Sequence, residues 1–317
     1  MLAQLEKEFP NDLQVVYRHF PLIGTPEQPF HDKAAISAQA AEAAGLQGKF
    51  WEMYELLMGR QGEWASLTPE QFETWVIEQA ESLDLDVSQF EKDLTSEAMT
   101  AIAQDAWTRG QEIGLPGTPF LLLNGTPYSA GIDLATLSAV IKLTMLQDRQ
   151  YTDCPPMQID PAKEYLARIT TEKGEIIVEL FAAQSPLAVN NFVFLAREGW
   201  YDGVTFHRVL PGFVAQAGDP SGTGYGGPGY AFKNEISDDL NFDQAGLLAM
   251  ANAGLDSNGS QFFITYAPAT QLNRSYTIFG RVISGMEVAE SLTPRDPAQN
   301  ANLPPGDTIL SITIEEK

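Results

Sequence analysis

The chain has 317 residues, of which 44% are hydrophobic, and this size predicts two domains that each bury a core. Lysine and arginine number 19 against 42 aspartates and glutamates, for a formal net charge of -23. Basic residues never gather in a patch of five or more, so we expect neither nucleic acid nor an anionic membrane surface as a partner. The sequence shows neither an apolar run long enough for a membrane span nor the start of a signal peptide, which predicts a cytoplasmic protein as the chain is written.

The cysteine and histidine content argues against a metal site or a thiol site. Cys154 is the single cysteine, which excludes an intrachain disulfide and a thiolate metal site. The three histidines, His19, His31 and His207, lie far apart and lack the spacing of metal ligands. We therefore expect no metal and no cofactor.

The N-terminal half is predicted to combine many helices with a few short strands. Apolar residues at three- and four-residue steps predict an amphipathic helix over 2–9. Thr68 and Gln71 form a capping box around Pro69, which predicts the start of another helix. The remaining predicted elements are a strand at 13–20, a helical block at 32–113, a buried strand at 120–123, a turn at 124–125, a partner strand at 126–130 and a helix at 134–146 capped by Asp133.

This order of elements resembles the thioredoxin fold with a helical insertion, and in detail the DsbA-like oxidoreductases. The resemblance rests on the segments Val16–Leu22, Ala40–Ala44, Gly48–Met53 and Gly117–Pro119. It implies that Pro119 is the family's cis proline, beside the active site.

The first strand and the C-x-x-C motif of that family are missing from the sequence. Without a pair of thiolates there is no thiol–disulfide exchange, so we assign no redox activity to the chain. Two explanations remain. The preferred one is a gene start assigned too far downstream, which would make the full protein an exported cell-envelope protein; the other is a redox-inactive binding or spacer module.

Residues 148–162 are predicted to be an extended linker between a domain at 1–147 and a domain at 163–317. The stretch around Cys154 has no period and continues into Pro155 and Pro156. Cys154 is interpreted as an exposed linker thiol or, alternatively, as a partner for an upstream cysteine or for another chain.

The C-terminal half has the pattern of an antiparallel β domain. Predicted strands lie at 165–170, 175–181, around 204–209, 213–217, 247–251, 261–266 and 277–283, and at 309–314. Helices are predicted after Ser185 and over 285–292. Many short strands with two helices favour a closed barrel with capped ends, so the whole chain is expected to join an α/β domain to a mainly β domain.

The same half resembles the cyclophilin-type peptidyl-prolyl isomerases. The resemblance covers 163–317 and rests on 206–218, 252–254, 258–263 and 279–282. It implies an eight-stranded antiparallel barrel capped by two helices. It further implies that the chain accelerates X–Pro isomerisation during protein folding and binds proline-containing unfolded or extended polypeptides.

Rotation about an X–Pro bond faces a barrier of about 18–20 kcal/mol because the nitrogen lone pair is delocalised. A donor that attracts this lone pair weakens the double-bond character, and an arginine is always charged and rich in donors. The resemblance gives this role to Arg208, with Gln216 holding the guanidinium and Phe213 beside it. Adjacent strand residues face opposite sides, so only one of Phe262 and Phe263 is expected in the pocket. The substrate-binding residues implied are Val214, Ala251, Asn252, Ala253, Gln261, Phe262, Leu272 and Tyr276.

Two positions depart from the family pattern. Gln271 stands where many eukaryotic members have a tryptophan that contacts cyclosporin, and Tyr276 replaces a histidine at the pocket rim. Weak cyclosporin binding is therefore expected. Two alternatives to an isomerase remain open: a non-catalytic chaperone or scaffold for proline-containing peptides, or a fragment of a disulfide oxidoreductase–isomerase fusion.

Overall fold

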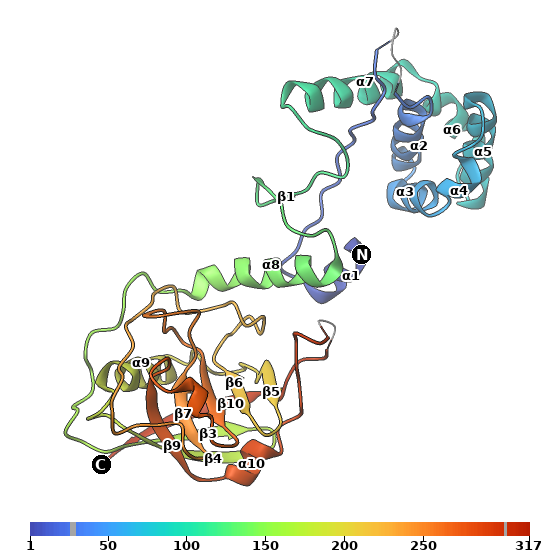
Figure 1. Cartoon of the computed structure of the whole chain (residues 1–317). Coiled ribbons are helices and arrows are strands. Elements are labelled where there is room, and N and C mark those ends of the chain that lie inside the picture. The colour runs from blue at the N-terminus through green and yellow to red at the C-terminus, as the bar shows by residue number, and fades with distance from the viewer. Residues whose placement is uncertain (26–29, 301–302) are drawn as a thin grey trace. The chain divides into compact units, whose positions relative to one another are not determined.

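A computed structural model describes residues 1–25, 30–300 and 303–317 of the chain (Figure 1). Its contacts divide the chain into two compact units, one formed by residues 9–130 and the other by residues 1–8 together with 131–317. Within the described residues, no helix is both long enough and apolar enough to cross a bilayer.

The unit of residues 9–130 is mainly helical. Its helices are α2 (Ala34–Leu46), α3 (Phe50–Gly59), α4 (Gln61–Trp64), α5 (Pro69–Ser82), α6 (Val87–Leu94) and α7 (Glu97–Glu112). Four of the five buried alanines of α2 let its neighbours approach closely, and Met53, Phe72 and Phe90 fill the space beside them. The capping box predicted for Thr68 and Gln71 is confirmed at the start of α5.

The prediction of a strand at 13–20 is wrong. Leu13 N–H donates to the carbonyl oxygen of Phe9 at 3.1 Å, and the rest of the segment has neither helical nor ladder hydrogen bonds to the described residues. The strands in the described part of this unit are β1 (Leu122–Leu123) and β2 (Thr126–Pro127), which form a short hairpin. An apolar stretch becomes a strand only when a second strand accepts and donates its backbone bonds. Among the described residues, no strand lies alongside it.

The hairpin also differs from its prediction. The turn at 124–125 is in place, but Phe120 is 38% exposed and Leu122 57% exposed, so the strand predicted to be buried is not. Pairing with one partner supplies backbone bonds but covers neither face of a strand. The Thr118–Pro119 peptide bond just before the hairpin is cis.

The second unit begins with two helices, α1 (Leu2–Glu8) and α8 (Leu134–Leu146), both as predicted. The Glu8 carboxylate joins them, since it accepts from Ser138 Oγ at 2.7 Å and pairs with Lys142 Nζ at 2.7 Å. Asp133 caps α8 through the backbone N–H of Thr136. After α8, the turn η1 (Gln147–Arg149) leads into the C-terminal part.

The C-terminal part of this unit is an eight-stranded antiparallel sheet. The strands are β3 (Tyr165–Thr171), β4 (Gly174–Leu180), β5 (Arg208–Leu210), β6 (Val214–Ala217), β7 (Leu247–Met250), β8 (Phe262–Thr265), β9 (Ile278–Ser284) and β10 (Ile309–Glu316). Their order is β10-β3-β4-β9-β7-β8-β6-β5. A bridge between Thr205 and Thr308, with backbone bonds linking 203–206 to 307–309, joins the two ends of this order. The sheet therefore curls onto itself, in agreement with the predicted strands.

Two helices accompany the sheet, α9 (Pro186–Arg197) and α10 (Met286–Glu290), together with the short turn η2 (Thr270–Leu272). The start of α9 is capped by the Glu235 carboxylate, which accepts from the backbone N–H groups of Leu187 and Ala188. Burial raises the pKa of Glu235 despite these bonds. Phe192 of α9 packs into the interior of the sheet, which is filled by apolar side chains.

Candidate active site

Three neighbouring strands bring the predicted polar residues together. Arg208 of β5 is paired with Gln216 of β6, and Gln216 is paired with Phe263 of β8. Directly paired residues of antiparallel strands project from the same face of a sheet. Arg208, Gln216 and Phe263 therefore form a row across one face.

A chain of hydrogen bonds fixes the orientation of the arginine. Arg208 Nη1 donates to Gln216 Oε1 at 3.4 Å, and Gln216 Nε2 donates to Gln261 Oε1 at 2.9 Å. Gln261 Nε2 donates in turn to the carbonyl oxygens of Gly224 and Gly226, both at 2.9 Å. Every amide oxygen in this chain meets a donor and every amide nitrogen meets an acceptor, so the two glutamines hold one another in register. The guanidinium uses one of its five N–H bonds in this chain.

An apolar wall lies beside this row. Phe263 packs with Val214 and Ala249 in a cluster separate from the main interior of the sheet, and Phe213, Leu272 and Tyr276 pack against that cluster. The rings of Phe263 and Tyr276 meet edge to face, with centroids 5.6 Å apart. The guanidinium carbon of Arg208 lies 6.0 Å from the centroid of the Phe213 ring, within reach of a weak cation–π contact. A charged donor next to an apolar wall suits a substrate with an apolar ring and a polar amide.

The prediction that Phe262 contributes to this wall is wrong. Phe262 is fully buried in the interior of the sheet, against Phe192 and Tyr201. Phe263 takes the place predicted for Phe262, because consecutive strand residues point to opposite faces. The sequence contained the signal: Gln261 and Phe263 are two residues apart and so share a face.

The segment that follows β7 borders the same strands. The backbone N–H of Ala251 donates to the carbonyl oxygen of Gln261 at 2.9 Å. Asn252 Nδ2 donates to the carbonyl oxygen of Ser275 at 3.1 Å, so its side-chain amide holds the segment in shape. Ala253 is exposed, and its N–H donates to Ser257 Oγ. The structure thus brings the predicted site residues of the C-terminal half, apart from Phe262, to one region of the sheet, while Pro119 belongs to the other compact unit.

His207 lies directly behind the site. It is buried, and neither ring nitrogen has a hydrogen-bond partner among the residues that the structure describes. Burial lowers the pKa of His207 from 6.5 to about 4; the Asp219 carboxylate opposes this shift, while Arg295 and Arg208 add to it. His207 is therefore a buried, neutral imidazole packed among its neighbours.

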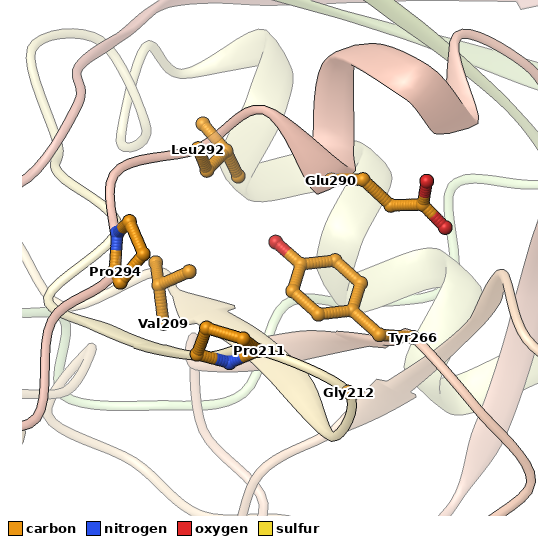
Figure 2. A pocket seen from close by; sticks show the side chains of 7 residues that line it. All are labelled: Val209, Pro211, Gly212, Tyr266, Glu290, Leu292 and Pro294. Atoms are coloured by element: carbon orange, nitrogen blue, oxygen red, sulfur yellow. The ribbon is translucent and has the colours of Figure 1, made fainter.

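A separate pocket of about 260 Å³ opens elsewhere on the second unit (Figure 2). It is lined by Val209, Pro211, Gly212, Tyr266, Glu290, Leu292 and Pro294. None of the predicted site residues lines it, and strand alternation at β5 directs Val209 away from the face that carries Arg208. This pocket is therefore distinct from the row that contains Arg208.

Comparisons with known proteins match the two halves of the chain to two different families. The family model for the cyclophilin type peptidyl-prolyl cis-trans isomerases matches residues 166–314, and a thioredoxin family model matches residues 5–143. Peptidyl-prolyl cis-trans isomerase ppi1 of Schizosaccharomyces pombe is 51% identical over 127 residues, which are 39% of this chain and 82% of that protein. Peptidyl-prolyl cis-trans isomerase A of Mycobacterium tuberculosis is 42% identical over 181 residues, 51% of this chain and 98% of that protein.

A solved cyclophilin-type isomerase of Cryptosporidium parvum is 39% identical and covers 49% of this chain and 99% of its own, with a TM-score of 0.45. The relatives and the family model establish the identity: the chain belongs to the cyclophilin-type peptidyl-prolyl isomerase family. Its N-terminal half is thioredoxin-like. The cyclophilin-type and thioredoxin-like assignments made from the sequence are thereby confirmed.

Proposed function

We propose that this chain catalyses cis–trans isomerisation of X–Pro bonds in unfolded or extended polypeptides, with Arg208 as the donor to the prolyl nitrogen. The observation that supports the proposal most strongly is the chain from Arg208 through Gln216 to Gln261. It holds one permanent cation beside an apolar wall, as twisting a prolyl amide requires.

In this mechanism the proline ring rests against Phe213 and Phe263 while the peptide continues past Asn252. As the C–N bond rotates, the nitrogen lone pair localises and becomes a better acceptor for Arg208. The hydrogen bond is therefore stronger in the twisted state than in either planar state, and this difference lowers the barrier. No covalent intermediate, metal or cofactor takes part. Gln261, whose amide is held by the carbonyl oxygens of Gly224 and Gly226, keeps Gln216 in place, and Gln216 prevents the guanidinium from turning away.

The substitution Arg208→Ala tests the role of the arginine. Loss of one preorganised donor to a developing charge costs about 10²–10³ in rate. We expect a loss of this size in the exchange between cis and trans forms of a proline peptide, measured by NMR, with the affinity for the peptide changed much less. Arg168→Ala is the matched control, because Arg168 pairs with Glu175 and Glu315 on exposed strand surface.

Unchanged exchange in Arg208→Ala would overturn the catalytic role. Peptide binding without any exchange in the wild-type chain would instead favour a non-catalytic chaperone or scaffold. We also propose weak binding of cyclosporin, because Gln271 is exposed and cannot supply an indole ring, while half-buried Tyr276 occupies the rim. Nanomolar inhibition of the exchange would contradict this.

For the N-terminal half we propose a DsbA-like origin without thiol exchange in this chain. Cys154, the single cysteine, is exposed, and its Sγ lies 3.4 Å from the carbonyl oxygen of Ala231. One thiol cannot form the intrachain disulfide of a dithiol oxidoreductase. Activity in a dithiol oxidation assay would refute this. We likewise propose domain limits of 1–147 and 163–317. We also propose a location in either the cytoplasm or the cell envelope.

A further inference from the structure

The segment Leu146–Tyr151, which we call the strap, packs against the glycine-rich loop Gly218–Gly229. At one end of the loop, Arg149 stacks on the Trp200 ring at 5.3 Å and donates to the Trp200 carbonyl oxygen at 3.2 Å. Trp200 Nε1 donates in turn to the carbonyl oxygen of Gly218 at 3.3 Å. The strap therefore reaches the start of the loop through one aromatic side chain.

The strap also holds the other end of the loop. Gln150 Nε2 donates to the carbonyl oxygen of Gly227 at 2.9 Å, and the N–H of Tyr151 donates to that of Pro228 at 2.8 Å. A side chain on Gly229 would overlap the Tyr151 carbonyl oxygen, and Gly229 has a φ of +91° that favours glycine. The approach of strap and loop is thus as close as two backbones allow.

Between these ends, the loop is organised by the fully buried Asp219 carboxylate. It accepts from Ser221 N, Ser221 Oγ, Gly224 N and Gly226 N at 2.6–3.0 Å. A side chain on Gly226 would overlap this carboxylate and approach Leu146 Cδ2 to 2.7 Å. The buried Leu146 side chain therefore packs beside Gly226, next to the carboxylate of Asp219 that accepts from the Gly226 N–H.

The loop backbone fixed in this way is the acceptor of the active-site chain. Gln261 donates to the carbonyl oxygens of Gly224 and Gly226, and through Gln216 it orients Arg208. We propose that the strap is a positioning element for the isomerase site. Leu146, Arg149 and Gln150 fix the conformation of the loop, and the loop fixes the orientation of the Gln261 side chain. The proposal rests on the function proposed above. By this proposal the strap, which leads from the N-terminal half into the sheet, also supports the site.

The primary test is Leu146→Ala in the full chain, with Met145→Ala as its matched control. Met145 is the preceding residue of the same helix and is exposed. We expect Leu146→Ala to lower the exchange rate of bound peptide by about 2- to 30-fold, the range for residues that act through others. The affinity of Leu146→Ala for the peptide should stay close to wild type. The exchange rate of Met145→Ala should also stay close to wild type. Leu146→Met, which refills the space, should restore the rate.

A second readout separates positioning from general destabilisation. At a temperature well below unfolding, Leu146→Ala and Gln150→Ala should shift the side-chain amide NMR resonances of Gln261 and Gln216, whereas Met145→Ala should not. Unmoved glutamine resonances together with a normal rate in both variants would overturn the proposal. If the wild-type chain itself shows no exchange, the proposed function fails, and the resonance shifts still decide whether the strap positions the site.

Discussion

The proposed isomerase site and the hairpin near Pro119 show opposite ways of presenting apolar side chains. Around Arg208, three paired strands and a hydrogen-bonded loop fix each polar group, and Phe263 is only 5% exposed. In the hairpin, two strands of two residues each pair only with one another, and Leu122 lies mostly in solvent. A two-stranded hairpin needs further strands or a helix packed against it before its face can hold side chains in one arrangement.

This difference teaches where preorganisation comes from in this chain. The guanidinium of Arg208 is held by neighbours that are themselves held, down to the buried Asp219 carboxylate. Within the described part of the chain, β1 and β2 of the hairpin form a two-stranded sheet with no further strand beside them. Substitutions in the C-terminal sheet should therefore have larger effects than substitutions in the N-terminal helical unit and its hairpin.

The largest effect is expected for Phe262→Ala in the sheet. Phe262 contacts Phe192 and Tyr201 and is fully buried, so its loss leaves a cavity that costs about 3–5 kcal/mol. Urea unfolding of the full chain should show the transition of the C-terminal sheet at much lower urea while the helical unit unfolds as before.

Phe263→Ala is the matched change on the opposite face of the same strand. It removes part of the proposed wall for the proline ring, so catalytic efficiency should fall about tenfold, equal to about 1.4 kcal/mol. If Phe262→Ala impaired peptide exchange without destabilising the sheet, the assignment of the two faces would be reversed.

A pH-dependent effect is expected from His207. The folded protein holds the pKa of His207 at about 4, below its usual 6.5, so the unfolded chain binds more protons between these values. Stability from this group is therefore present above pH 6.5 and lost as pH falls towards 4, with a total of about 3 kcal/mol. His207→Phe should reduce the pH dependence of the unfolding free energy between pH 4.5 and 7. Equal slopes for variant and wild type would contradict the neutral, unpaired state of the imidazole.

The sheet was more predictable from the sequence than the rest because its pattern is local. Residues 165–171 alternate between buried and half-buried positions, and such alternation survives in the sequence as a period of two. Residues 13–20 show a similar pattern, yet whether they form a strand depends on a partner strand distant in sequence. The period of two in the sequence carries no information about such a partner strand, and so the prediction of a strand at 13–20 was wrong.

The candidate site residues were named from the resemblance to a family and not from a local pattern. The structure pairs two of them, Arg208 and Gln216, directly across β5 and β6. The choice between Phe262 and Phe263 depended on which of them shares a strand face with Gln261. Residues two apart share a face, so the position of Gln261 in the sequence favours Phe263. The contribution of Leu146 had no sequence signal, because it depends on the fold bringing the strap against the loop.

A smaller effect is expected for Thr68→Ala in the helical unit. Thr68 Oγ1 accepts from the N–H of Gln71, and the Gln71 side chain accepts from the N–H of Thr68. Loss of such a cap costs about 1 kcal/mol. The transition of the helical unit should therefore move to lower urea. Thr74→Ala, an exposed change in the interior of the same helix, should leave it equal or slightly more stable.

The smallest effect is expected for Leu122→Ser in the hairpin. Leu122 is 57% exposed, so the substitution removes little buried apolar surface and should change the unfolding free energy by less than about 0.5 kcal/mol. The same change at Leu248, fully buried in β7, should cost several times more because it places a hydroxyl in the interior of the sheet. A large destabilisation by Leu122→Ser would show that the hairpin face is covered in solution. Such an outcome would remove the contrast in support between the two halves, because the hairpin would then have its own backing layer.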